Sequence, residues 1–197
     1  MTLDFKSLGS AFMVLGSAGN IVGVVAAKPL SNRSSKKRVF FFAMILAMVF
    51  SFIFYVFTPA TLLFIFLFQL LTSMCAGIIF PLLWSMYADV ADYSEWKTGR
   101  RATGLIFSSS SMSQKFGWTI GGALTGWLLA LFGFQANLAQ SAETLTGIRM
   151  MMSFIPGIAA LISAGFIFVY QLDADFVDKI TGELAERRAA EEDDSSI

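Results

Sequence analysis

The chain has 197 residues, of which 56% are hydrophobic and only 14% are charged, whereas soluble domains carry about 25% charged residues. A mean hydropathy of +0.68 and 21 phenylalanines require a lipid solvent. Lysine plus arginine and aspartate plus glutamate number 14 each, so the charge balance indicates no nucleic-acid partner. Composition therefore excludes an ordinary soluble domain and predicts an all-α, polytopic membrane helical bundle in contact with membrane lipid.

The sequence lacks the side chains of most metal sites and many catalytic sites. Histidine is absent and Cys75 is the only cysteine. This excludes an intrachain disulfide, a Cys/His metal site and a Cys-His nucleophile. We expect no cofactor and no enzyme activity, although an integral-membrane enzyme that uses Asp89 or Asp92 is an alternative without a visible nucleophile.

Long uncharged stretches predict five membrane-spanning helices, because about 20 apolar residues cross a hydrocarbon core roughly 30 Å thick. The stretch 39–88 has no charge and is long enough for two helices. Thr58-Pro59 divides it, since proline lacks an N–H and disfavours helix at the residue before it. The predicted spans are about 7–27, 39–57, 61–87, 102–132 and 147–170, which form one domain over 1–170, followed by a tail over 171–197.

The positions of the basic residues predict the orientation. They collect in the segment 28–38, in the segment 97–101 and in the tail, and basic residues favour the cytoplasmic side. Five spans then place the N-terminus outside and the C-terminus in the cytoplasm. Within the tail, apolar residues recur every four positions and predict an amphipathic helix on the cytoplasmic face: Leu172, Phe176, Ile180 and Leu184.

Lys115 lies deep inside the fourth predicted span, about 21 Å along the helix from Arg101. A charged amine there costs at least about 2.5 kcal/mol, so it must face a water-filled cavity or a partner, or be neutral. Spacing of three and four residues puts it on one stripe with Ser108, Ser111 and Trp118. Serine and lysine donors beside an aromatic ring suit a hydroxylated ligand such as a sugar. The alternative is a structural ion pair with a partner helix.

Three glycine pairs stand one helical turn apart, which lets membrane helices approach closely: Gly19 and Gly23, Gly117 and Gly121, and Gly122 and Gly126.

Acidic and basic residues gather at the end of the third predicted span. Asp89, Asp92 and Glu95 recur at every third position, and three cations follow: Lys97, Arg100 and Arg101. Such a cluster can act as a cytoplasmic gate that closes in one state and breaks in the other. The alternative is a solvated loop whose charges only set the topology.

Three stretches carry a resemblance to a known family. The run PLLWSMYADVADYSEWKTGRRATGLIFSSS, the loop GFQANLAQSAETLTGIR and a last span ending in YQLD resemble the C-terminal half of the glycoside-pentoside-hexuronide:cation symporters. These are melibiose-carrier-like members of the major facilitator superfamily. The segment KPLSNRSSKKR resembles the basic loop between their eighth and ninth helices. The resemblance covers about residues 9–185 and implies that the five spans correspond to helices 8 to 12 of a twelve-helix fold.

The resemblance also implies site residues. The lysine and polar residues of the family's eleventh helix fall on Lys115, Ser111 and Ser110, and the aromatic of its tenth helix falls on about Phe80, with Trp84 one turn further. Ser110 and Ser111 stand where melibiose carriers have an amide and a threonine, so the sugar preference does not carry over. With Trp118 of the polar stripe, these residues form the candidate sugar site.

We therefore expect sugar:cation symport by alternating access in the bacterial inner membrane. The family's carboxylates for Na+ or H+ lie on N-terminal helices, which are not in this chain, so we expect a truncated or split half. Its partners would be the sugar substrate and the N-terminal half of the same transporter. The alternative is a non-transporting membrane subunit or an inactive fragment that kept the shape of the half-bundle.

Overall fold

The computed structural model describes residues 5–57 and 61–195, and within these ranges it contains helices and no strand. The all-α prediction is confirmed, while the break predicted at Thr58-Pro59 lies outside the described residues. The elements are α1 (Phe5–Arg33), α2 (Lys36–Phe54), α3 (Leu62–Thr98), α4 (Thr103–Leu131), α5 (Ala142–Phe166), the short 3-10 helix η2 (Ile167–Val169) and α6 (Ala174–Ser195).

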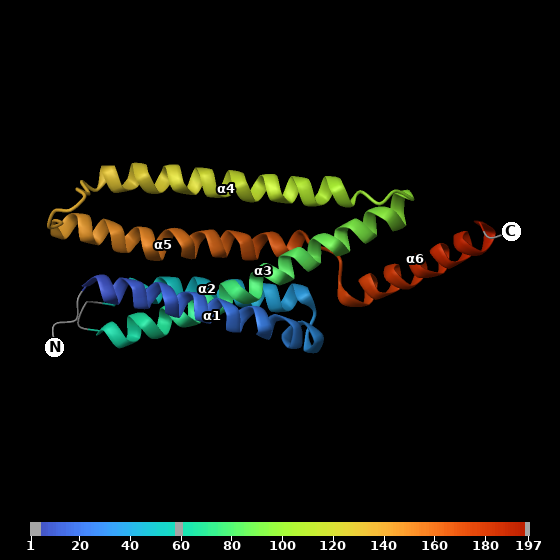
Figure 1. Ribbon diagram of the computed structural model, residues 1–197, viewed down its shortest axis with the longest axis horizontal. Helices are drawn as coiled ribbons and strands as arrows, with labels where there is room; N and C mark the ends of the chain where they lie inside the picture. Colours follow the sequence, from blue (N-terminus) through green and yellow to red (C-terminus); the bar gives the residue numbers. More distant parts are fainter. Residues whose placement is uncertain (1–4, 58–60, 196–197) are drawn as a thin grey trace.

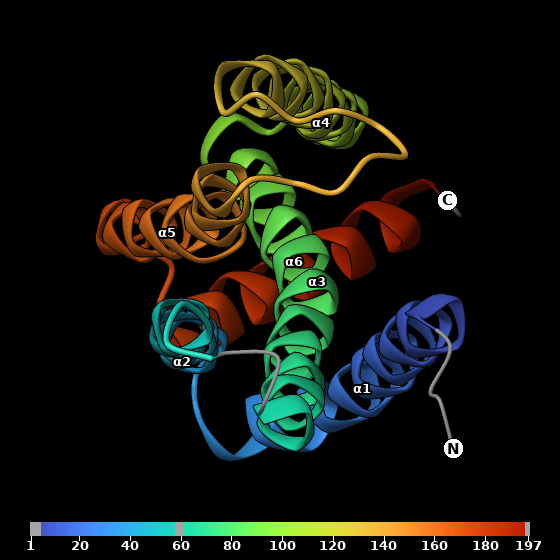
Figure 2. The same ribbon diagram turned by 90° about the vertical axis from the view of Figure 1, so that its left-hand side faces the viewer.

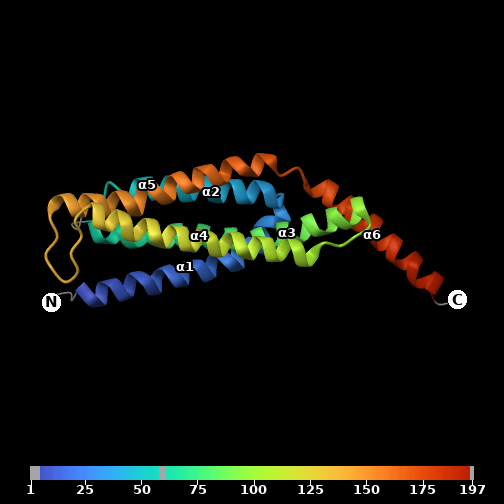
Figure 3. The same cartoon turned by 90° about the horizontal axis from the view of Figure 1, so that it is seen from above.

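Helices α1 to α5 run along the long axis of the molecule, and α6 projects from one end (Figure 1). Viewed along this axis, α3 is central, with α2 and α5 on one side of it and α1 and α4 at its other flanks (Figure 2). The view from above likewise places α1 and the α2–α5 pair on opposite sides of α3 (Figure 3). We call the end that holds the α1–α2 turn, the end of α3 and α6 the charged end.

Four helical segments are long and apolar enough to cross a membrane: Ser7–Arg33, Lys36–Phe54, Leu62–Thr98 and Ala142–Val169. Helix α4 has 29 residues, about 43 Å at 1.5 Å per residue, so its length also suffices. Its serines and Lys115 over the segment 108–115 lower its hydropathy. The bundle thus combines four strongly apolar helices with α4, which is also long enough to cross a membrane but carries a polar segment.

The basic segment 28–38, expected as a loop, is mostly helical. Helix α1 continues through Pro29 to Arg33, and α2 begins at Lys36. Only Ser34 and Ser35 separate the two helices. Pro29 removes one helical hydrogen bond without ending α1, so the basic residues of this segment have fixed positions on helix ends.

Helix α3 also extends past its predicted end at residue 87. It runs to Thr98, where Gly99 adopts a φ of 68°. The Gly99 N–H donates to the Glu95 carbonyl oxygen (2.8 Å), which is the left-handed ending that glycine favours. Asp89 and Asp92 therefore stand on a continuous helix and not in a solvated loop.

Helices α1 and α3 meet backbone to backbone. A Cβ atom on Gly23 would overlap the Met74 carbonyl oxygen, and a Cβ atom on Gly77 would overlap the Asn20 carbonyl oxygen. A Cβ atom on Gly19 would lie 2.8 Å from the Leu70 carbonyl oxygen. Small residues permit this approach, so the close packing predicted for the first glycine pair is confirmed.

The apolar core joins α2, α3 and η2. Its buried members are Val39, Phe40, Leu82, Met86 and Ile167. Further along α2, the Phe52 ring fills the space beside Gly157 of α5. The α2–α3–α5 side of the bundle is therefore packed along much of its length.

Helix α4 is packed differently, because none of its residues is buried. Its contact with α3 includes a stacked ring pair, Phe107 and Trp84, with centroids 5.7 Å apart. A Cβ atom on any of its glycine pairs would meet nothing within 4 Å. The predicted close packing of these pairs has no partner helix among the described residues.

We expect the substitution Gly77→Ala to lower the free energy of unfolding by about 1–3 kcal/mol, because the new methyl group collides with α1 backbone that cannot rotate away. Denaturation of the detergent-purified chain by SDS, followed by circular dichroism, measures this. Gly121→Ala is the matched control: its methyl group meets open space, and alanine favours helix by up to about 1 kcal/mol over glycine. Equal losses in both variants would contradict the α1–α3 contact.

Candidate functional site

Two of the four predicted sugar-site residues of α4, Ser111 and Lys115, line a shallow groove on that helix, whereas Ser110 and Trp118 do not. Ser108, Ser111, Met112 and Lys115 contribute to it, with Phe116 and Thr119. Within the described residues, the Lys115 ammonium group makes no ion pair and no hydrogen bond. In this part of the chain the groove therefore offers one cation that nothing neutralises.

The hydroxyl groups on this stretch differ in their availability. The Ser110 hydroxyl donates to the Ile106 carbonyl oxygen at 2.8 Å, and the Ser108 hydroxyl donates to Leu105 at 3.1 Å. The Ser111 hydroxyl has no partner within the ranges that the structure describes. Ser111 and Lys115, one turn apart in the groove, are thus the polar groups best placed to bind a ligand.

Aromatic side chains connect α3 to the first turns of α4. Trp84 stacks on Phe107 and lies 6.2 Å from Phe80 and 5.9 Å from Tyr87, measured between ring centroids. Phe107 is one helical turn before Ser111, but none of these rings lines the groove itself. Phe107 and Tyr87 are not among the residues predicted from the sequence, although Phe107 precedes Ser108 and Tyr87 lies close to Trp84 in the chain.

Trp118 stands apart from this aromatic group. Its side chain is 70% exposed, and it makes no ring contact with Trp84 or Phe80 among the described residues. Figure 2 shows α6 in the sector between α4 and α1, and Figure 1 shows that this helix projects from the charged end, away from the groove. The predicted site is therefore one wall, formed by α3 and α4, and Trp118 lies at its margin.

At the charged end, Asp89 is the centre of a buried polar contact. Both of its carboxylate oxygens accept hydrogen bonds from Lys36 Nζ, at 2.7 and 2.8 Å, and Tyr170 Oη donates to Oδ2 at 3.2 Å. Asp89 is only 7% exposed. Because Lys36 begins α2 and Tyr170 follows η2, one carboxylate holds three parts of the bundle together.

Two further contacts support this arrangement. Lys37 Nζ donates to the Tyr170 carbonyl oxygen at 2.6 Å and lies 3.8 Å from Asp173. Tyr170 follows directly after Val169, the last residue of η2. Burial raises the pKa of the Tyr170 phenol, and the nearby Asp89 carboxylate raises this pKa further by a smaller amount. The Tyr170 hydroxyl therefore stays protonated and remains a donor to Asp89.

A second ionic cluster lies beyond Asp89 on the same helix. Arg101 contacts Asp92 at 3.0 Å and Glu95 at 3.4 Å, and Arg188 of α6 contacts Glu95 at 2.7 Å. Arg101 folds back over the end of α3 just before α4 begins. The carboxylates thus connect the end of α3 to the start of α4 and to the tail.

The remaining two predicted gate cations do not join these ion pairs. Lys97 lies over the Tyr93 ring, 5.6 Å from its centroid. The Arg100 side chain is exposed and makes no ion pair within the described residues. The six residues predicted as one cluster therefore separate into a buried pair around Asp89, a surface cluster around Glu95, and two cations outside both.

Helix α6 docks on the end of α3 through apolar and aromatic residues. Phe176 packs against Tyr93 and Trp96, with centroids 6.2 and 5.9 Å apart, and Trp96 Nε1 donates to Glu183 at 2.6 Å. Ile180 is also buried. Leu184 is buried as well, so three of the four apolar residues predicted to face one side of the tail helix pack against the protein.

No metal site is visible in the described ranges, where no group of three or more histidine, cysteine, aspartate or glutamate side chains could hold an ion. Asp89 and Asp92 are both bound by cations, which suits packing and not general acid-base work.

Comparison with known proteins gives the family. The family model described as MFS/sugar transport protein matches residues 1–174. The inner membrane symporter YicJ of Escherichia coli strain K12 is 32% identical over 155 residues, which is 78% of this chain and 34% of that protein.

Two further relatives carry transporter names. The putative glycoside/cation symporter YagG of the same strain is 32% identical over 193 residues, 96% of this chain and 41% of that protein. The isoprimeverose transporter of Lactiplantibacillus pentosus is 41% identical over 115 residues, 58% of this chain and 24% of that protein. The chain thus spans less than half the length of these relatives.

The family match covers most of the chain. These relatives are described as transporters and not as enzymes. The chain is an integral membrane protein that belongs to the MFS/sugar transport protein family, the melibiose-carrier-like symporters of the major facilitator superfamily.

Proposed function

We propose that this chain acts as the C-terminal half of a sugar:cation symporter that works by alternating access. The observation that carries the proposal is the wall formed by α3 and α4. On α4 a groove holds the unpaired Lys115 and Ser111, and Phe107, one helical turn before Ser111, stacks on Trp84 of α3. Major facilitator transporters bind substrate at the midplane between two helical halves. A second half would close this wall into a cavity.

Each member of the wall has a role in this proposal. Lys115 and Ser111 donate hydrogen bonds to sugar hydroxyl oxygens, while the Trp84 and Phe80 rings cover the apolar face of the sugar. Ser110 contributes less, because its hydroxyl is bound to its own helix. Trp118, at the margin, contacts only a substrate that extends along α4.

The coupling cation, Na+ or H+, would bind the N-terminal half. Asp89 is the one carboxylate buried within α3, and Lys36 already neutralises it. None of the five predicted spans contains a carboxylate. This chain by itself therefore offers no free acidic oxygen for an ion inside the membrane.

The charged end would form the cytoplasmic gate, with the N-terminus of the chain outside and the bundle in the bacterial inner membrane. The basic residues at this end support that orientation, and the relative YicJ, an inner membrane symporter, supports that membrane. In this role Asp89, Asp92, Glu95 and Arg101 hold α2, α3, α4 and α6 together in one state and separate in the other. Lys97 and Arg100 remain accessible to the opposing half.

The alternative function is a non-transporting subunit with the same half-bundle. Co-purification with a membrane protein that supplies the N-terminal helices supports the transporter. Purification of the chain with no such partner, from cells that lack sugar uptake, supports the alternative.

The substitution Lys115→Ala should reduce uptake of a radiolabelled glycoside by the assembled transporter roughly 10- to 100-fold, because a hydrogen bond from a charged donor contributes about 1.5–3 kcal/mol. Thr125→Ala is the control on the same helix, since the Thr125 hydroxyl binds the Gly121 carbonyl oxygen and lies outside the groove. Wild-type uptake by Lys115→Ala, at normal protein levels, would reject the sugar-binding role.

The substitution Asp89→Ala should lower the melting temperature of the purified chain, with a loss of about 1–2 kcal/mol. A fully buried pair costs about 3–5 kcal/mol when one partner is removed, but the Lys36 side chain is 35% exposed and can gain water. Asp178→Asn is the control, because Asp178 makes no ion pair in the described residues. The swap Asp89→Lys with Lys36→Asp should recover part of the loss, and failure of both effects would contradict the pairing.

A further inference from the structure

We propose that the α1–α2 turn binds an anionic glycerophospholipid, with its phosphate at Arg33 and Arg38 and one acyl chain in the apolar groove beneath them. Two adjoining cavities carry this inference, one basic and one apolar. They share Arg33, Ser34, Arg38 and Phe42 as lining residues. The order of the two cavities, polar at the charged end and apolar toward the membrane interior, is the order of the parts of a lipid.

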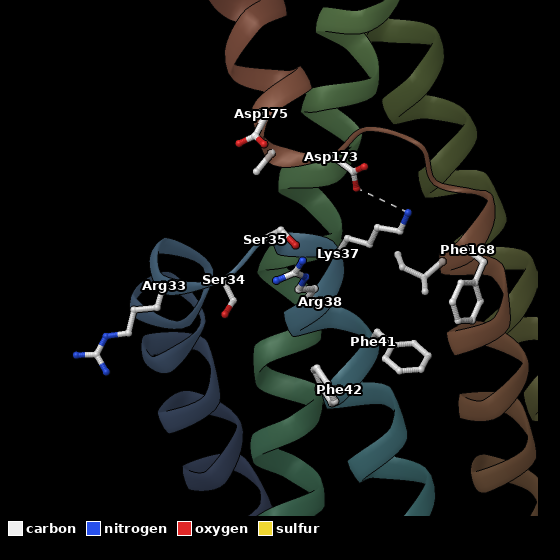
Figure 4. A pocket seen from close by; sticks show the side chains of 12 residues that line it. Arg33, Ser34, Ser35, Lys37, Arg38, Phe41, Phe42, Phe168, Asp173 and Asp175 are labelled. Atoms are coloured by element: carbon white, nitrogen blue, oxygen red, sulfur yellow. Dashed lines mark ion pairs between the residues drawn. The ribbon is translucent and has the colours of Figure 1, made fainter.

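The basic cavity has a volume of about 600 Å³, within the range of roughly 300–1,000 Å³ that ligand sites occupy. Arg33, Lys37 and Arg38 supply its cations, Ser34 and Ser35 supply hydroxyl groups, and three phenylalanine rings form its membrane side: Phe41, Phe42 and Phe168 (Figure 4). Cations above aromatic rings match the polar boundary of a bilayer, where such residues anchor helices.

The charges of this cavity are not all available. Lys37 turns toward Asp173 (Figure 4), at 3.8 Å, and donates to the Tyr170 carbonyl oxygen. Asp175 also lines the cavity, so three cations face two carboxylates. Arg33 and Arg38, however, make no ion pair and no hydrogen bond with a side chain in the described ranges. These two guanidinium groups are therefore free to bind phosphate, for which their planar donors are suited. Figure 4 shows the Arg33 side chain directed away from Arg38, so Arg33 must turn toward Arg38 for both to bind one phosphate.

The apolar groove begins at the same two arginines. It has a volume of about 530 Å³ and lies between α1, α2 and α3. Val39, Ala43 and Cys75 form a buried floor, while Leu46 and Phe42 at its rim are 46% and 62% exposed. The further lining residues are Leu30 and Ile78. The apolar side chains of this groove provide no favourable contact for a soluble anion, but they suit an acyl chain.

The alternative explanation is that Arg33 and Arg38 only set the membrane topology, as basic residues near helix ends do. That explanation requires positive charge at this end but no cavity and no groove below it. Basic pockets between membrane helices bind anionic headgroups. The adjoining groove adds a contact with the acyl chain of the lipid, and this contact does not depend on charge. The two components can be tested separately.

The test uses the full 197-residue chain purified in detergent with equal amounts of phosphatidylglycerol and phosphatidylcholine, and native mass spectrometry to count bound lipid. We expect a preference for phosphatidylglycerol that falls roughly tenfold or more in the double variant Arg33→Gln and Arg38→Gln. The matched control removes two exposed cations outside the basic cavity and the groove, by Lys28→Gln and Lys179→Gln. Equal loss in both double variants would overturn the site and leave only general surface charge.

The groove is tested by Leu46→Trp, which fills it from its exposed rim without changing charge. Bound phosphatidylglycerol should fall several-fold, whereas Val49→Trp, on the same helix but outside the groove, should leave it unchanged. Circular dichroism and melting temperature show that each variant is folded. Unchanged lipid binding by a folded Leu46→Trp would overturn the acyl-chain part of the proposal.

The source of the phosphate is tested by competition with soluble glycerol 3-phosphate. A lipid site predicts that millimolar glycerol 3-phosphate displaces little phosphatidylglycerol, because it lacks the acyl chain. Complete displacement would instead assign the arginines to a soluble phosphate ester and overturn the lipid assignment.

Discussion

A charged side chain inside a membrane needs an opposite charge, water or a ligand, and the described part of this chain meets the requirement for Asp89 but not for Lys115. Asp89 is buried but bound by Lys36 and Tyr170. Lys115 is on a helix of membrane-spanning length and has no ion pair in the described residues. The paired carboxylate serves the packing of this bundle, whereas the unpaired amine requires something that approaches from outside the described helices.

Helix α3, with 37 residues, carries the paired Asp89 and also contacts α4, the helix of the unpaired Lys115. Gly77 meets α1, Trp84 meets α4 and Asp89 meets α2. Pro81, between Gly77 and Trp84, lacks one helical hydrogen bond and is a natural point for bending. A displacement at Asp89 would therefore move Trp84 with it, while the α1 contact below Pro81 holds the other half of α3 in place.

The sequence was sufficient for the features that depend on local pattern. Uncharged stretches predicted the helices, although α3 continues to Thr98 and does not end at residue 87 as predicted. The sequence did not predict contacts between distant segments. Lys36 and Asp89, for example, are far apart in the chain, and no spacing rule relates them. The same limitation explains the glycine pairs, because a pair indicates only that close approach is possible. Gly23 has α3 beside it, whereas Gly121 has open space.

The open face of α4 bears on how this bundle is completed. Exposed leucine or tryptophan is well solvated by lipid, so such residues on a membrane helix require no partner. Glycine and serine gain little from lipid contact, and membrane helices use them where another helix or a polar ligand comes close. On α4 these residues lie on the same helix as Lys115, which also requires a neighbour. Packing and electrostatics therefore each support the proposal that a second half of the transporter lies against this part of α4.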